Sequence, residues 1–150
     1  MVKSQTRYWI VTVGLVAVLG IVLFTLYTQR QRPEPVFPAT INRDCAPWDG
    51  AAFTLKIPIH QGAILDISIW QSPDIHRSIT FSFPNGAHQT GNVSLIPQFG
   101  EPEQLTGTVW FKNVREGMPI EGRFSLTSES GARLEAKFVA EWDDQIVYCG

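Results

Sequence analysis

The two cysteines are the residues whose type and spacing point most directly to chemistry, here the formation of a disulfide bond. Cys45 and Cys149 are the only cysteines of this 150-residue chain, and they bracket all of the sequence that has a globular pattern. A cysteine pair at the two ends of a domain is typical of a stabilising disulfide, and such bonds persist in oxidising compartments. We therefore expect Cys45 and Cys149 to be bonded and their domain to lie outside the cytoplasm. Two unrelated buried thiols in a cytosolic domain are the alternative.

The histidines do not have the spacing of a metal site or of a catalytic motif. His60, His76 and His88 lie sixteen and twelve residues apart in predicted turns or loops, without a HExxH pair. Asp74 is close enough in sequence to His76 to form an acid–base pair, but no GxSxG motif or third partner accompanies it. We therefore predict no catalytic residue, no metal site and no cofactor. An enzyme with a site near Asp74 and His76 remains an alternative.

Tryptophan is frequent in the globular part of the chain. Trp48, Trp70, Trp110 and Trp142 lie there, and the alternation of apolar residues predicts that the last three face away from the main apolar rows. On an exposed sheet face, Trp70, Trp110 and Trp142 could form a platform for a sugar or a partner protein, so they are the candidate binding surface. The alternative is that both faces are partly covered, or that the rings shield strand ends.

The charge of the globular part argues against two classes of partner. Residues 45–150 contain seven Lys or Arg and twelve Asp or Glu, a net charge near −5. This balance argues against nucleic acid and against lying flat on anionic lipid. The acidic clusters lack the spacing of a calcium loop and are expected to serve solubility; they comprise Glu101, Glu103, Glu141, Asp143 and Asp144. Asn92 begins an Asn-Val-Ser acceptor pattern for N-glycosylation, which requires a eukaryotic secretory context.

The N-terminal region contains an apolar stretch with the length of a membrane span. Residues 8–29 carry no charged side chain, and as a helix they extend for roughly 33 Å, against about 30 Å for the hydrocarbon core of a bilayer. Tyr8, Trp9 and Tyr27 lie at its ends, where aromatic rings suit the membrane interface. No small-residue cleavage site follows. We expect an uncleaved signal-anchor helix over 8–29, after a cytoplasmic tail of residues 1–7. The numbers of Lys and Arg residues before and after the helix are nearly equal and do not decide its orientation in the membrane. The expected disulfide therefore decides it, and places the C-terminal part outside the cytoplasm.

Two segments of different composition follow the apolar stretch. Residues 30–44 are polar and contain three prolines, at positions 33, 35 and 38, which favours an extended stalk. Residues 45–150 alternate apolar and polar side chains with a period of two, the pattern of half-buried strands. We therefore predict an extracytoplasmic β-domain over 45–150 that the disulfide closes.

Turn residues divide this domain into about eight strands without a long helix. The expected strands are 53–59, 63–70, 77–83, 92–96, 104–114, 119–128, 132–142 and 145–149. Short turns separate the last four, which are expected to form an antiparallel meander. The sequence thus predicts an all-β, antiparallel β-sandwich, with a small β-barrel as the alternative.

The expected function follows from the anchored architecture and the lack of chemical motifs. We expect a membrane-anchored, extracytoplasmic, non-catalytic binding or accessory domain with a protein partner. A small β-domain that binds a sugar or a lipid is the first alternative, which a large apolar cavity would favour. The enzyme near Asp74 and His76 is the second.

Overall fold

The computed structural model describes residues 34–84, 90–143, 145 and 147–149, and apart from one 3₁₀ turn the regular structure in these residues consists of β-strands. The long strands are β1 (Val36–Cys45), β2 (Ala51–Pro58), β3 (Ile64–Ile69), β5 (Ile79–Phe83), β6 (Gly91–Ile96), β8 (Thr106–Phe111), β10 (Ile120–Thr127) and β11 (Arg133–Trp142). The two-residue strands are β4 (Asp74–Ile75), β7 (Glu103–Gln104) and β9 (Val114–Arg115), and one 3₁₀ turn, η1, spans His60–Gly62. The all-β prediction is confirmed.

The predicted membrane helix and cytoplasmic tail lie outside the described residues, as do residues 30–33 of the predicted stalk and His88. Within the part of the chain that the structure describes, no helix combines the length and the apolar character that a bilayer crossing requires.

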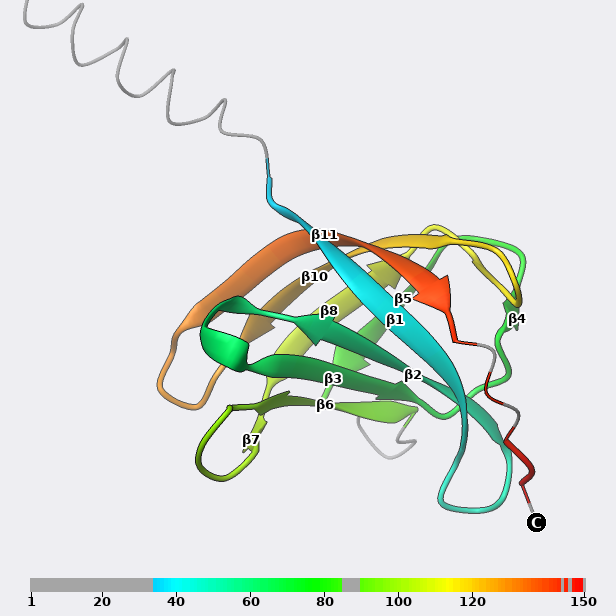
Figure 1. Cartoon of the computed structure of the whole chain (residues 1–150), viewed down its shortest axis with the longest axis horizontal. Coiled ribbons are helices and arrows are strands. Elements are labelled where there is room, and N and C mark those ends of the chain that lie inside the picture. The colour runs from blue at the N-terminus through cyan, green and yellow to red at the C-terminus, as the bar shows by residue number, and fades with distance from the viewer. Residues whose placement is uncertain (1–33, 85–89, 144, 146, 150) are drawn as a thin grey trace, which may run out of the picture. The chain divides into compact units, whose positions relative to one another are not determined.

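Nine strands form one continuous sheet in the order β5-β8-β10-β11-β1-β2-β3-β6-β7. All neighbours are antiparallel except β1 and β11, which run parallel. Figure 1 shows the sheet curling around a common interior, and β5 near one edge comes into contact with β6 near the other. The strands therefore belong to a single curled sheet rather than to the two facing sheets of a sandwich, because β1 joins the N-terminal hairpin to the C-terminal meander. β4 and β9 form a separate two-stranded sheet.

The stalk predicted for residues 30–44 is wrong from Val36 onward, because Val36–Cys45 is strand β1 near the centre of the sheet. Phe37, Ala39 and Ile41 alternate toward the interior and pack in the core. β1 pairs with β11 on one side and β2 on the other. The prolines conceal this alternation, since proline is rare within paired strands. The β-domain thus begins about nine residues before the predicted boundary at residue 45.

The predicted meander is confirmed for three of its four strands. β8, β10 and β11 are consecutive antiparallel neighbours, but residues 145 and 147–149 have no strand pairing. The free side of β11 is taken by β1 instead. The hairpin predicted around residues 60–62 is also confirmed, as β2, η1 and β3. The strands predicted over 77–83 and 92–96 correspond to β5 and β6.

Aromatic rings fill the interior of the curled sheet. Phe111 on β8 meets the rings of Phe53, Phe81 and Phe138, with centroid separations of 5.8, 5.9 and 5.6 Å. All four rings are buried. Gly122 on β10 lies against this group, and a Cβ atom there would come within 2.2 Å of Cζ of Phe138. The large rings therefore depend on the absence of a side chain at Gly122.

Candidate functional site

The predicted disulfide is present and links the end of β1 to the C-terminal segment. Cys45 is the last residue of β1, and its Cα lies 5.5 Å from that of Cys149. The two residues are 104 positions apart in the sequence. Next to the bond, Arg43 forms an ion pair with Glu116 and donates a hydrogen bond to the carbonyl oxygen of Gln145 at 3.3 Å. The covalent link and these contacts together hold the C-terminal segment beside β1.

The structure does not gather Trp70, Trp110 and Trp142 into one platform. Trp110 on β8 lies under the guanidinium of Arg123, 5.3 Å from the ring centroid. Trp142 at the end of β11 packs against the core, and its Nε1 donates to the carbonyl oxygen of Arg115 at 2.9 Å. The prediction that Trp142 faces away from the main apolar row is wrong, because Trp142 continues the inward alternation of β11. Trp70 contacts the ring of Trp48.

Asp74 and His76 lie within ion-pair distance of each other at the surface. Nε2 of His76 lies 2.9 Å from Oδ1 of Asp74, and both side chains are mostly exposed. Asp74 lines a cleft of about 390 Å³ beside the disulfide, in which the Arg43 guanidinium is paired with Glu116. His76 is not among the residues that line this cleft. No three potential metal ligands cluster within the described ranges.

An apolar row crosses the outer face of five adjacent strands. It consists of Val139 on β11, Pro38 on β1, Pro58 on β2, Ile64 on β3 and Ile96 on β6, and we call it the outer apolar row. Val139 pairs with Pro38, Pro58 with Ile64, and Ile64 with Ile96. Pro38 meets Pro58 when the register of β1 and β2 is continued by two residues. Each of the three aliphatic members is more than a third exposed.

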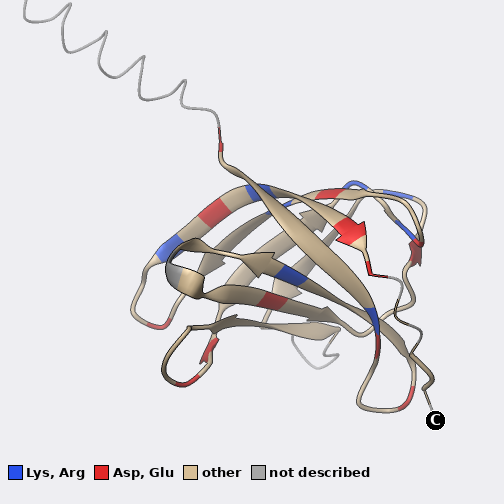
Figure 2. Cartoon of the chain, viewed as in Figure 1, with Lys and Arg blue, Asp and Glu red and all other residues tan. Residues whose placement is uncertain are grey.

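The side chains of the outer apolar row are themselves uncharged, and charged side chains lie beside the row along the strands. Lys137 and Glu141 flank Val139 on the outer side of β11, and Lys56 and Asp66 are the next outward residues after Pro58 and Ile64. Figure 2 shows no Lys, Arg, Asp or Glu on β6 or on the ends of β2 and β3 that flank η1. On the far side of Val139, Lys112 and Glu121 form an ion pair at 3.2 Å. Contiguous exposed apolar surface on a small domain is characteristic of an interaction site.

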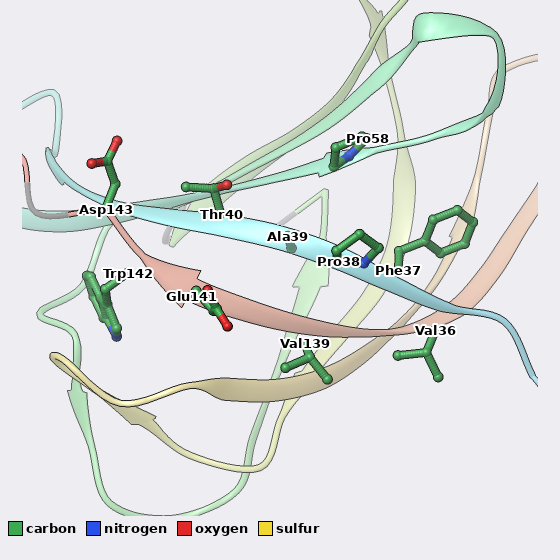
Figure 3. A pocket seen from close by; sticks show the side chains of 10 residues that line it. All are labelled: Val36, Phe37, Pro38, Ala39, Thr40, Pro58, Val139, Glu141, Trp142 and Asp143. Atoms are coloured by element: carbon green, nitrogen blue, oxygen red, sulfur yellow. The ribbon is translucent and has the colours of Figure 1, made fainter.

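A groove opens over one end of this row, between β1 and β11. Its volume is about 780 Å³, and Figure 3 shows Val36, Pro38 and Val139 at one end of it. Glu141 and Asp143 line the other end. Asp143 is held there by a hydrogen bond of 3.1 Å from Nδ2 of Asn42. The groove thus combines an apolar floor with two carboxylates at one end.

A second set of outward side chains joins two carboxylates through two hydroxyls, and we call it the polar chain. Oγ1 of Thr54 donates to Oδ2 of Asp44 at 2.5 Å and lies 3.2 Å from Oγ of Ser68. Ser68 donates in turn to Oδ1 of Asp66 at 3.5 Å. Partial burial raises the pKa of Asp66 above its ordinary value, and Lys56 opposes this rise by electrostatic attraction.

The raised pKa of Asp66 predicts a pH dependence of stability. The folded state binds a proton on Asp66 at pH values where the unfolded chain has already lost it, so this group contributes less stability as pH rises from about 4 toward neutrality. Asp66→Asn removes the titration. We expect the difference in unfolding free energy, Asp66→Asn minus wild type, to increase from pH 4 to pH 7 when it is measured by urea denaturation. A constant difference would contradict the assignment, and Asp49→Asn is the control at an exposed loop carboxylate.

No protein-family model, curated protein or solved structure matches the chain. Three features of the structure were not predicted from the sequence: the outer apolar row with its groove, the polar chain, and the contact between Trp48 and Trp70. The row has a sequence signal, since Ile64 and Val139 are apolar at positions where alternation calls for polar residues.

Proposed function

We propose that this chain is a membrane-anchored, extracytoplasmic, non-catalytic domain that docks a partner protein on the outer apolar row. The observation that carries the proposal is the row itself, a line of exposed apolar side chains across five strands with a groove at one end. Apolar surface of this kind stabilises a complex when it is removed from water. The two carboxylates in the groove add a polar end that can fix the orientation of the partner.

The length of the chain before β1 indicates where the partner lies. In the proposed topology the membrane helix ends at residue 29, and six residues separate it from Val36, the first residue of β1. Six residues reach at most about 22 Å. Val36 and Pro38 line the groove, so the docking surface begins close to the bilayer. We therefore propose that the partner is itself a membrane protein.

Three further observations support this function over the alternatives. The disulfide between Cys45 and Cys149 agrees with an oxidising compartment on the outer side of the membrane. The rings around Phe111 occupy the interior of the sheet, where a barrel-type carrier of a sugar or lipid would hold its ligand. The acidic balance of residues 45–150 disfavours nucleic acid. Docking on the outside of the sheet is the function that these features favour.

Charged substitutions in the row test the proposal. Ile64→Glu and Val139→Glu place a carboxylate on β3 and β11 without touching the core, because both side chains point outward. We expect each to reduce capture of the partner from detergent-solubilised native membranes by at least about tenfold, since an ionised group in an apolar contact must be desolvated. Quantitative mass spectrometry of proteins bound to the tagged full-length chain measures the effect.

Thr108→Glu is the matched control, because Thr108 is an exposed outward position on β8, beyond the row. A membrane protein that binds the wild type and Thr108→Glu equally, but not the two row variants, supports the proposal. Equal capture by all four chains, or a partner without a membrane segment, would overturn it.

A further inference from the structure

Two tryptophans form an exposed aromatic pair at the end of the sheet where β1 and β2 are joined. The rings of Trp48 and Trp70 are nearly perpendicular, with centroids 5.6 Å apart. Trp48 is 60 % exposed, which is unusual for so large an apolar side chain. Trp70 follows the last residue of β3 and is partly buried. An indole held at the surface against a second indole presents an apolar face to solvent.

The loop between β1 and β2 holds Trp48 in place. The backbone nitrogen of Ala46 donates to the carbonyl oxygen of Gly50 at 2.8 Å, and that of Asp49 donates to the carbonyl oxygen of Ala46 at 2.9 Å. A Cβ atom at Gly50 would lie 2.7 Å from Nε1 of Trp48, so the indole folds closely over the glycine. Asp49 adopts a φ of 60°, a conformation that Asp and Asn tolerate better than most residues. The exposed indole is therefore positioned by its own turn.

The polar chain lies on the same face as this aromatic pair. Trp70, Ser68 and Asp66 alternate with the inward residues of β3 and so share its outer side. Trp70 lies four positions after Asp66 along the chain, which in a strand is a distance of roughly 13 Å. Ser68 pairs with Thr54 on β2 and with Asn92 on β6. An aromatic surface thus continues into a line of hydroxyl, amide and carboxylate groups.

The composition of this face matches the chemistry of one ligand class. A pyranose ring has an apolar face of C–H groups, which stacks on an indole, and an edge of hydroxyls, which need closely spaced donors and acceptors. Asn92 is exposed, and Asp44, Ser68 and Asp66 are partly exposed, so these side chains supply them here. The buried hydroxyl of Thr54 supports them through its hydrogen bond to Asp44 and its contact with Ser68. Asp44 and Asp66 disfavour an anionic ligand. A protein partner would require apolar anchors that this line lacks.

We propose that Trp48, Trp70 and the polar chain form a binding site for a short, uncharged oligosaccharide, with Trp48 as the stacking platform. The site adjoins the outer apolar row on β3, where Asp66 is the next outward residue after Ile64, but it lies outside the groove, which is lined by β1, β11 and the end of β2. Binding of soluble sugars and capture of a protein partner are measured separately, so failure of this proposal is distinguishable from failure of the docking function.

Titration of the full-length chain in detergent with three uncharged tetrasaccharides tests the site. The probes are the β1,4-linked tetramers of glucose, N-acetylglucosamine and mannose, whose rings present flat faces. We expect at least one to bind in calorimetry and to change the tryptophan fluorescence. Trp48→Ala should weaken that binding about tenfold, and Asn92→Ala about three- to tenfold, because each removes one contact.

Trp110→Ala is the control, because Trp110 is a partly exposed indole on β8 that contacts Arg123 instead. It should leave the affinity unchanged. Absence of binding by all three probes at millimolar concentration would overturn the proposal, as would equal affinities for the wild type and Trp48→Ala. Because Trp48 and Asn92 are both exposed, retained thermal unfolding in the variants separates loss of the site from loss of the fold.

Discussion

Replacing Cys149 by serine is expected to lower the melting temperature of the purified chain by an amount on the order of 10 °C in non-reducing buffer. Cys45 and Cys149 are 104 positions apart, and closing a loop of about 100 residues is worth up to about 4.7 kcal/mol in the chain-entropy model. Such a loss is a large share of the roughly 5 to 15 kcal/mol by which a domain is stable. At this domain size each kcal/mol corresponds to roughly 3 to 6 °C. Thermal unfolding followed by circular dichroism measures the shift.

Further variants test whether the lower melting temperature results from loss of the disulfide itself. Cys45→Ser and the double variant should unfold at the same temperature as Cys149→Ser, because all three remove one and the same bond. Reducing agent should bring the wild type to that temperature and leave the variants unchanged. An unaltered melting temperature for Cys149→Ser would contradict a stabilising role for the bond.

The local elements of the fold could be predicted because each carries its own periodic signal. Alternating apolar residues and turn residues between them define the hairpin of β2 and β3 and the meander of β8, β10 and β11. The disulfide could be predicted because only two cysteines are present and they bracket the domain. In each case the deciding residues are close in sequence or chemically unambiguous.

The long-range pairing could not be predicted in the same way. β1 and β11 are parallel neighbours about 100 residues apart, and no short-range pattern specifies such a pair. The prolines of β1 also suggest a stalk, although Pro38 lies toward the start of the strand and on its outer side. Once β1 occupies the side of β11, residues near Cys149 have no strand to pair with there. One missed strand therefore accounts for the errors at both ends of the domain.

The candidate sites could be predicted only in part from the sequence, because they too depend on long-range strand pairing. Ile64 and Val139 break the alternation of their strands, but a row appears only when the registers of five strands are known. Trp48 lies in a loop where alternation carries no information, so its contact with Trp70 depends on the turn that ends at Gly50. The prediction that Trp142 faces outward, in contrast, was wrong although the regular alternation along β11 places its side chain on the inner face. The membrane helix over residues 8–29 stays a prediction.

Phe111→Ala is expected to destabilise the domain by about 3 to 5 kcal/mol, the usual cost of removing a buried phenylalanine ring. Phe111 is fully buried and contacts three other rings, from β2, β5 and β11, so its removal leaves a cavity that touches strands across the whole sheet. Urea denaturation of the purified chain measures the loss. Phe99→Ala is the control, because Phe99 is 86 % exposed and its removal should change stability by less than about 0.5 kcal/mol.

A milder variant keeps the test decisive if Phe111→Ala does not fold. Phe111→Leu retains most of the side-chain volume and should cost about 1 to 2 kcal/mol. Because Gly122 leaves no room for a Cβ beside Phe138, the interior is fitted to large rings and cannot easily be refilled by movement of β10. Equal stabilities of Phe111→Leu and Phe99→Ala would mean that the ring group is loosely packed. In that case an interior ligand site, which the filled core now disfavours, would regain support over docking on the outer face.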